Sequence, residues 1–391
     1  MDFRLGQASE EFRAEVRRFL DEHLTAEVVE RAWRTGTMHD WGFHRALAAK
    51  GWLAAAWPPE LGGQGRDPFE MAALTEEMAY RGAPVDGWGT SELVANTLRV
   101  VGTEEQRRSV IPRILSGEVI VCLGYSEPDS GSDVAAAKTR AQRQGDEWVI
   151  DGQKVFTTLA HEAAYVFLLT RTDPEAPKHL GLTMFLVPMD TPGIEVVPVR
   201  TLGGERTNMT FYTGVRVPDS CRVGEVNGGW EVMKVALAFE RQPAANQAAR
   251  RLLRQVEEWA RQALAPGGAR VIDSDAARLA LAKAAVAAEV GKLLGHRMHW
   301  LASRGRLPVV EGSMAKLFGS EAFREAASQL LGLAGPAGVL EAPDPRAPAG
   351  GWIGHAFRHA QVTTIYAGSS EIQRSIIAER GLGLPRARPP G

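Results

Sequence analysis

Two short segments carry residues whose types and spacing suit the binding of a ligand. The loop from Ser126 to Asp133 combines hydroxyl side chains with a glycine-rich backbone, which can present N–H groups to a phosphate or to the polar edge of a ligand ring. The segment from Ser369 to Gln373 opens a predicted helix, and the unpaired N–H groups of a helix N-terminus suit a pyrophosphate. Taken alone, the first segment is typical of an ordinary surface turn and the second of a simple helix cap.

The elements that must position these segments begin with a helical region, residues 1–117. Apolar residues recur there at the spacing of one buried helix face, namely Phe12, Val16, Phe19 and Leu20. A second helical run covers residues 69–80. Prolines and glycines at 57–63 predict a loop, because they interrupt the helical pattern.

The middle region, residues 118–228, is predicted to be β-structure. Short apolar strands are expected at 165–170, 182–187, 194–199 and 210–217. The pair Asp151-Gly152 predicts a hairpin turn between strands at 148–150 and 153–156, because a type I′ turn needs positive φ. Several short strands separated by turn residues indicate a sandwich or barrel.

The last region, residues 229–384, is predicted to be helical again. A helix at 230–264 with a kink at Pro243 and a long one at 274–303 are typical of a helix bundle. A capping box of Ser370 and Gln373 should start a final helix that stops at Gly381. The Pro/Arg-rich tail at 385–391 is expected to be disordered.

Composition excludes several classes of protein. The chain has 391 residues, 45% of them apolar and 24% charged, with a net charge of -2, and its basic residues are too scattered for a nucleic-acid face. Cys122 and Cys221 form no CxxC pair, and no GxGxxG follows a strand. The N-terminus lacks a signal-peptide pattern and no apolar run is long enough to span a bilayer, so a soluble, cytoplasmic protein is expected.

The histidines do not predict a metal site. His355 and His359 are four residues apart and His296 and His299 three apart, yet neither pair has a third ligand in a known motif. Packed or surface histidines are the favoured interpretation, and no metal is expected.

The stretch at 365–374, Ile-Tyr-Ala-Gly-Ser-Ser-Glu-Ile-Gln-Arg, resembles the C-terminal signature of the acyl-CoA dehydrogenase family of FAD enzymes. Four further stretches resemble that family in the same order, at 124–133, 152–158, 215–230 and 238–241, so the resemblance covers most of the chain. It implies an α+β fold with an N-terminal helical domain (1–117), a middle β-barrel or sandwich domain (118–228) and a C-terminal four-helix bundle (229–384).

The resemblance also implies a set of FAD-binding residues. Ser126 would bond the pyrimidine edge of the flavin, and Ser132 would contact cofactor or CoA. Thr158 would lie at the N5 edge, beside Phe156, which stands where the family often has tryptophan. Further cofactor contacts are implied for Gln329, Ser369, Ser370 and Glu371, although the charge of Glu371 replaces a neutral glutamine.

The catalytic base is the main departure from the family pattern. The commonest members carry a catalytic glutamate where this chain has Ala367. A sub-group, including the isovaleryl and long-chain enzymes, keeps the glutamate on another helix directly before an arginine, which matches Glu240 before Arg241. The resemblance therefore implies Glu240 as the base and Arg241 on the substrate side, and a surface Glu–Arg pair is the alternative. The backbone N–H of Ala367 would bind the thioester carbonyl.

The implied reaction is dehydrogenation of an acyl-CoA to the trans-2-enoyl-CoA. Glu240 would remove the α-proton, flavin N5 would accept the β-hydride, and an electron-transfer flavoprotein would reoxidise the FAD. The stretches 124–128 and 171–179 resemble, more weakly, actinobacterial enzymes for steroid side-chain CoA esters. Two alternatives stay open: a non-catalytic subunit that completes a partner's flavin site, and a flavin oxidase or monooxygenase of the same fold.

Two motifs that hold the FAD of a neighbouring subunit in the family are incomplete here. The Arg-x-x-Phe-Gly motif is missing, and only Arg270 could replace its cation. The Gln-x-x-Gly-Gly motif is reduced to Gln329-Leu-Leu-Gly-Leu333. A pyrophosphate needs cations or donors. The chain is therefore expected either in a homo-oligomer that makes do with Arg270 or backbone donors, or in a mixed tetramer with a paralogous subunit.

Overall fold

The structure is a computed structural model that describes residues 5–239 and 245–386, in two units. One unit combines Met1–Glu22, Asp67–Ala83 and Arg241–Gly391, and the other combines His23–Arg66 and Pro84–Glu240. The expected kink at Pro243 and the end of the expected tail, residues 387–391, lie outside the described residues. Each unit is described by itself.

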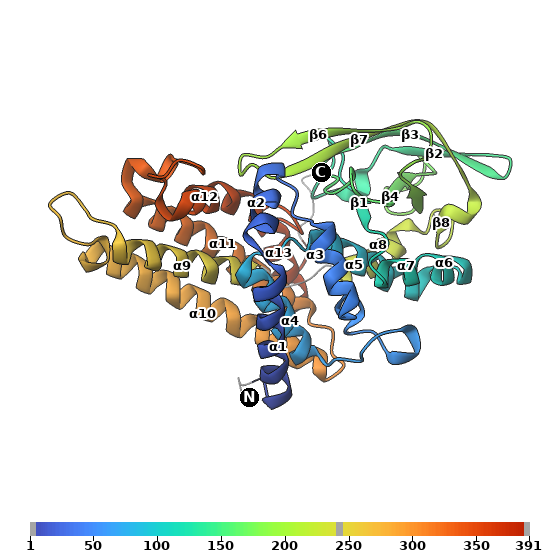
Figure 1. The fold of residues 1–391 in the computed structure, drawn as a ribbon. Helices are drawn as coiled ribbons and strands as arrows, with labels where there is room; N and C mark the ends of the chain where they lie inside the picture. Colours follow the sequence, from blue (N-terminus) through green and yellow to red (C-terminus); the bar gives the residue numbers. More distant parts are fainter. Residues whose placement is uncertain (1–4, 240–244, 387–391) are drawn as a thin grey trace. The chain divides into compact units, whose positions relative to one another are not determined.

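The first unit is helical. Its helices are α1 (Gln7–His23), α4 (Pro68–Arg81), α9 (Ala245–Gln262), α10 (Asp275–Ser303), α11 (Val309–Ala334), α12 (Trp352–Thr363) and α13 (Ser370–Ile376). Helices α9, α10, α11 and α12 pack against one another as a bundle, and α4 packs on α9 and α10 (Figure 1). Leu252, Phe323 and Ile353 fill the bundle core with many small alanines between them. Across the described residues, no helix is long and apolar enough to cross a membrane.

Helix α4 shows how local sequence sets an element's ends. Asp67 caps it through bonds to the backbone N–H groups of Phe69 and Glu70, and the Glu70 side chain reaches back to the Asp67 N–H, 3.1 Å away. Pro68 occupies the first helical position, where no N–H is needed. Gly82 ends the helix in the left-handed region at φ 70°. The predicted helix at 69–80 is therefore confirmed.

A buried charge cluster ties α1, α4 and α10 together. Arg13 donates to Glu76 (2.9 Å) and to Glu77 (3.0 Å), and His296 Nε2 lies 3.0 Å from Glu76 Oε1. Burial raises the pKa of Glu76, but the hydrogen bond from His296 and the charge of Arg13 outweigh it and bring that pKa to about 2. His296 thus has the packed role that the sequence favours.

The second unit is built on one sheet. Its eight strands are β1 (Val121–Gly124), β2 (Arg140–Gln144), β3 (Glu147–Lys154), β4 (Tyr165–Arg171), β5 (Leu182–Pro188), β6 (Ile194–Arg200), β7 (Arg206–Pro218) and β8 (Arg222–Val223). They follow the order β6-β7-β3-β2-β4-β5-β8, and β1 pairs with β4 in parallel. The strands predicted at 165–170, 182–187, 194–199 and 210–217 are all present.

The predicted hairpin at Asp151-Gly152 is wrong. Strand β3 includes both of these residues and continues to Lys154. The turn that joins β2 to β3 is instead Gly145-Asp146. A bulge between Ile150 and Gly152 shifts the register against β7. Gly152 has φ 148°, and a Cβ there would lie 2.7 Å from the Thr139 Cα. The glycine therefore serves a bulge with a close backbone approach, a common use of glycine inside a strand.

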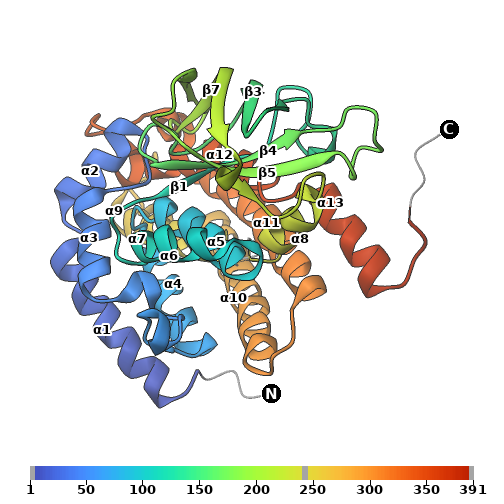
Figure 2. The ribbon, with the colours of Figure 1, turned by 90° about the vertical axis from the view of Figure 1, so that its right-hand side faces the viewer.

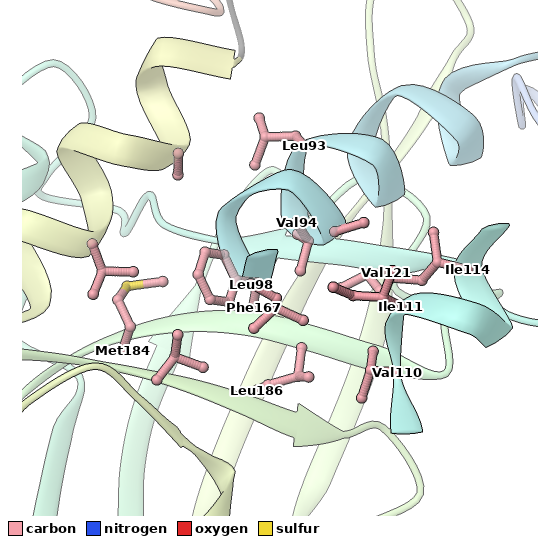
Figure 3. Close-up of a cluster of buried hydrophobic side chains, with 14 of the residues drawn as sticks. Leu93, Val94, Leu98, Val110, Ile111, Ile114, Val121, Phe167, Met184 and Leu186 are labelled. Atoms are coloured by element: carbon pink, nitrogen blue, oxygen red, sulfur yellow. The ribbon is translucent and has the colours of Figure 1, made fainter. Parts of the chain in front are cut away.

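Helices of the second unit pack on this sheet and beside it. They are α2 (Ala26–Thr35), α3 (Trp41–Ala49), α5 (Asp86–Val101), α6 (Glu104–Ser109), α7 (Ile111–Leu115) and α8 (Gly229–Phe239). Helices α5 and α8 lie side by side against the sheet (Figure 2). Figure 3 shows Leu98 of α5 beside Phe167 of β4, in a cluster that also includes Leu93 and Val94 of α5 and Met184 of β5. The loop expected at 57–63 contains only one 3₁₀ turn, Pro59–Leu61.

Two buried histidines make the second unit sensitive to acid. Burial lowers the pKa of His39 to about 4. Burial, together with the charge of the neighbouring His39, lowers the pKa of His44 to about 3. Their rings lie 4.9 Å apart, and within the described chain neither nitrogen of His39 has a hydrogen-bond partner.

We expect the free energy of unfolding to fall as pH drops from 6.5 toward 3. The unfolded chain takes up these protons near pH 6.5, whereas folded His39 and His44 take them up only near 4 and 3. Each shift corresponds to on the order of 3 kcal/mol. Urea unfolding at pH 7, 6 and 5 measures the slope. His44→Phe should flatten it, and an unchanged slope in that variant would contradict the assignment.

Candidate functional site

The loop that follows β1 carries two of the predicted cofactor residues. Ser126 is half-buried and Ser132 is exposed. The backbone N–H of Val155 donates to the Ser126 carbonyl at 2.9 Å, which fixes the loop to the end of β3. Ser126 is thereby brought next to the segment that carries Phe156 and Thr158.

A buried ion pair, which the sequence analysis missed, holds the two motifs together. Glu127 accepts hydrogen bonds from Lys154 Nζ (2.7 Å) and from the backbone N–H groups of Lys138 (2.7 Å) and Thr139 (2.8 Å). Lys154 also donates to the Tyr125 carbonyl, at 3.2 Å, and its side chain is fully buried. Both charged residues lie inside the stretches at 124–133 and 152–158, which is the one sequence signal that could have pointed to them.

The pKa values of this pair shift for identifiable reasons. Burial lowers the pKa of Lys154 to about 8, although the charge of Glu127 opposes that shift. Burial also raises the pKa of Glu127, but Lys154 and the two backbone donors outweigh it and hold that pKa below its ordinary value. The pair is therefore charged at neutral pH and rigidly joins the loop to β3.

The segment after β3 presents an aromatic ring and a threonine. Phe156 and Leu159 both have left-handed backbone angles, with φ of 58° and 65°. The Phe156 side chain is 64% exposed, which is unusual for a large apolar ring. Thr158 Oγ1 lies 3.1 Å from Thr207 Oγ1 on β7. Phe156, Thr158 and Ser126 thus lie in one area of the second unit.

The loop before α13 holds Ala367 in the first unit. Ala367 and Gly368 have φ of 51° and 82°. Lys316 Nζ on α11 donates to the Gly368 carbonyl at 2.7 Å. Gln373 Nε2 donates to the carbonyls of Ala367 (3.0 Å) and Gly368 (3.2 Å). These donors fix the Ala367–Gly368 and Gly368–Ser369 peptide groups, which directly follow the Ala367 N–H in the loop.

The predicted capping box at α13 is wrong by one residue. Ser369 is the N-cap, and its hydroxyl accepts from the Ile372 N–H at 3.4 Å. Ser370 is the first helical residue, and Gln373 bonds the preceding loop instead of the cap. The error arose because the capping-box pattern pairs Ser370 with Gln373, whereas the residue three positions after the true N-cap, Ser369, is Ile372. The Ser369 hydroxyl lowers the pKa of Glu371, which is exposed and negatively charged.

Each unit, taken by itself, carries features that fit the flavin that the resemblance implies. On the first unit, the buried Ser370 hydroxyl has no hydrogen-bond partner within the described residues. Ile365, five residues earlier in the chain, is 64% exposed. On the second unit, the exposed Phe156 ring offers an apolar wall. A polar hydroxyl suits the polar edge of a flavin, and an apolar ring suits its flat face.

Several other predicted site residues are outside the described region or engaged elsewhere. Glu240 and Arg241 lie outside the described residues, although α8 ends at Phe239, directly before them. Gln329 donates to Glu325 on its own helix at 2.9 Å. Arg270 Nε donates to Asp273 at 2.9 Å on an exposed loop, so its charge is already paired.

Comparisons with known proteins show the family of this chain. Three family models match in succession: the acyl-CoA dehydrogenase N-terminal domain at residues 6–118, the middle domain at 122–213 and the C-terminal domain at 227–382. They follow the helical, β and helical order that the sequence predicts.

Individual relatives are similar over most of their length. Acyl-CoA dehydrogenase FadE26 of Mycobacterium tuberculosis is 41% identical over 352 residues, covering 87% of each chain. The Tcur3481-Tcur3483 steroid ACAD has 37% identity and a TM-score of 0.90, covering 99% of this chain and 100% of that one. The ChsE4-ChsE5 complex from Mycobacterium tuberculosis has 36% identity and a TM-score of 0.89 with the same coverage. This chain belongs to the acyl-CoA dehydrogenase family, whose members are FAD-dependent oxidoreductases that act on CH–CH bonds.

Proposed function

We propose that this chain catalyses the α,β-dehydrogenation of an acyl-CoA thioester to the trans-2-enoyl-CoA and passes the electrons to an electron-transfer flavoprotein. FAD, when bound, supplies the acceptor for the hydride. The observation that carries the proposal is the left-handed Ala367 loop, in which Lys316 and Gln373 anchor the two peptide groups that follow the Ala367 N–H. A backbone donor next to anchored peptide groups suits a thioester carbonyl that gains negative charge during the reaction.

In this proposal, one residue binds the thioester carbonyl and another removes the α-proton. The Ala367 N–H binds the thioester carbonyl and makes the α-proton more acidic. The Glu240 carboxylate, which follows α8 in the sequence, removes that proton. In this proposal, Glu240 supplies the side-chain base that Ala367 lacks.

For the substrate, we propose the CoA ester of a steroid side chain. The support is similarity: one solved structure that matches 99% of this chain, at 37% identity, is described as a steroid ACAD. Anaerobic addition of a steroid side-chain CoA ester to the FAD-loaded protein should bleach the flavin absorbance. Straight-chain acyl-CoA esters of several lengths serve as comparison, and bleaching only by those would overturn the steroid assignment.

We further propose a mixed tetramer with a paralogous subunit. Leu333 stands where the family motif has glycine, and Arg270 is paired with Asp273, so this chain offers little to a neighbour's pyrophosphate. Both of the similar solved structures named above carry two polypeptide names, Tcur3481-Tcur3483 and ChsE4-ChsE5.

Purified alone, the chain is therefore expected to hold less than one FAD per chain. Co-expression with the paralogous subunit should give a tetramer with fewer flavins than chains. Light scattering measures the mass and flavin absorbance measures the ratio. Arg270→Ala should leave the FAD content unchanged in either preparation. A homotetramer of this chain with one tightly bound FAD per chain would contradict the mixed assembly.

A further inference from the structure

The segment from Phe156 to Leu159 has a backbone that its own residues do not favour. Two non-glycine residues, Phe156 and Leu159, are left-handed, a conformation that costs on the order of 1–3 kcal/mol each. The surrounding structure must therefore hold the segment in place.

Asn208, on β7, is the residue that does so. It is fully buried, and its backbone carbonyl accepts from the Thr157 N–H at 2.9 Å. Its side-chain Nδ2 donates to the Thr157 carbonyl at 2.9 Å. Asn208 thus bonds both the backbone N–H and the backbone carbonyl of Thr157, which lies between Phe156 and Thr158 in the chain.

The rest of the Asn208 amide is also engaged. Arg206 Nε donates to Oδ1 at 3.1 Å, and Nδ2 lies 3.2 Å from His161 Nδ1. Burial and the charge of Arg206 lower the pKa of His161, so its ring is neutral and Nδ1 accepts. His161 Nε2 then carries the proton and faces Thr37 Oγ1 at 3.1 Å. With every donor and acceptor used, only an amide in this orientation satisfies the site.

We propose that Asn208 is a positioning residue for the flavin, acting through Thr157 to fix Thr158 and Phe156 against the ring. This inference rests on the proposed function. The carbonyl that Asn208 bonds belongs to the same peptide group as the Thr158 N–H. A change at Asn208 therefore moves or rotates the peptide group from which the Thr158 side chain projects, without touching the cofactor itself.

Asn208→Asp tests the proposal with little change in volume. Aspartate keeps an acceptor for Arg206 but places an oxygen against the Thr157 carbonyl. In the FAD-loaded assembly we expect roughly tenfold weaker FAD binding, about 1.4 kcal/mol. At saturating FAD, the absorption bands and midpoint potential should shift. A tenfold change in the relative affinity for oxidised and reduced flavin corresponds to roughly 30 mV. Hydrogen exchange should also rise in the peptide covering residues 156–161.

Asn227→Asp is the matched control. Asn227 accepts from Thr172 through its side-chain oxygen, which aspartate retains, and it lies in the same unit. It should leave FAD affinity, potential and exchange at 156–161 as in the wild type. If Asn208→Asp does not fold, Thr210→Val removes the contact between Thr210 Oγ1 and Thr157 Oγ1, 3.2 Å apart, and should shift the same potential.

The outcomes separate this inference from the proposed function. If the wild-type assembly binds FAD but no acyl-CoA ester bleaches it, the proposed reaction is wrong. The role of Asn208 is then still tested by FAD affinity and midpoint potential, because neither measurement needs a substrate. If Asn208→Asp lowers thermal stability while FAD affinity, absorption bands and potential stay at wild-type values, Asn208 is only structural and the inference is overturned.

Discussion

Glu240→Gln is expected to slow substrate-dependent bleaching of the flavin by roughly 10²- to 10⁴-fold, the range for loss of a general base. Glutamine keeps the size of the side chain but accepts no proton at neutral pH. FAD binding should be unchanged, because the substitution alters only the group that takes the α-proton. Anaerobic stopped-flow absorbance with a steroid side-chain CoA ester measures the rate.

Glu231→Gln provides a matched control nine residues earlier in the chain. Glu231 is an exposed residue of α8, paired at the surface with Lys234, and its loss should change the rate less than twofold. Near wild-type bleaching by the Glu240→Gln assembly would show that the base lies elsewhere. The chain would then be better explained as a subunit that completes a partner's site.

Lys154→Met is expected to lower the free energy of unfolding by roughly 3–5 kcal/mol, the cost of leaving one member of a buried ion pair without its partner. Methionine nearly matches the lysine in volume, so packing is kept. The Glu127 carboxylate would remain buried with its two backbone donors but without a cation. Urea unfolding at pH 7, followed by tryptophan fluorescence, measures the change.

A surface pair gives the control for this second prediction. Lys138 pairs with Asp129, and both side chains are more than 70% exposed, so Lys138→Met should cost less than about 1 kcal/mol. The double variant Glu127→Gln/Lys154→Met should recover part of the loss, because no isolated charge remains. Equal effects of Lys154→Met and Lys138→Met would show that the buried pair contributes no more than a surface one.

The strands of the second unit were predictable because each is a short apolar run bounded by turn residues. Asp151-Gly152 misled the prediction because its chemistry suits a turn and a bulge equally well, and the choice depends on Thr139 across the sheet. The cap of α13 was misplaced because Gln373 completes a capping-box pattern with Ser370, whereas the Gln373 side chain bonds the preceding loop and Ser369 caps the helix alone.

The candidate site was predictable only where its residues face a ligand. Ser126, Phe156 and Thr158 belong to motifs that can be read along the chain. Glu127 and Lys154 are separated by 27 residues, and nothing local indicates that two opposite charges will be buried together. Asn208 lies 51 residues from Thr157. In the sequence, nothing distinguishes it from any other polar residue of a strand. Such supporting contacts depend on how the strands pair.

The charge cluster of α1, α4 and α10 has a consequence for the order of events on the ribosome. Glu76 is separated from His296 by 220 residues, so α1 and α4 are synthesised long before the helices that complete their unit. All of the second unit, up to residue 240, emerges before α10 does. Because domains generally fold as units during synthesis, the sheet should form before α1 and α4 can pack against α10. We expect Arg13, Glu76 and Glu77 to stay exposed to water until α10 has been synthesised, because their cluster is completed by His296.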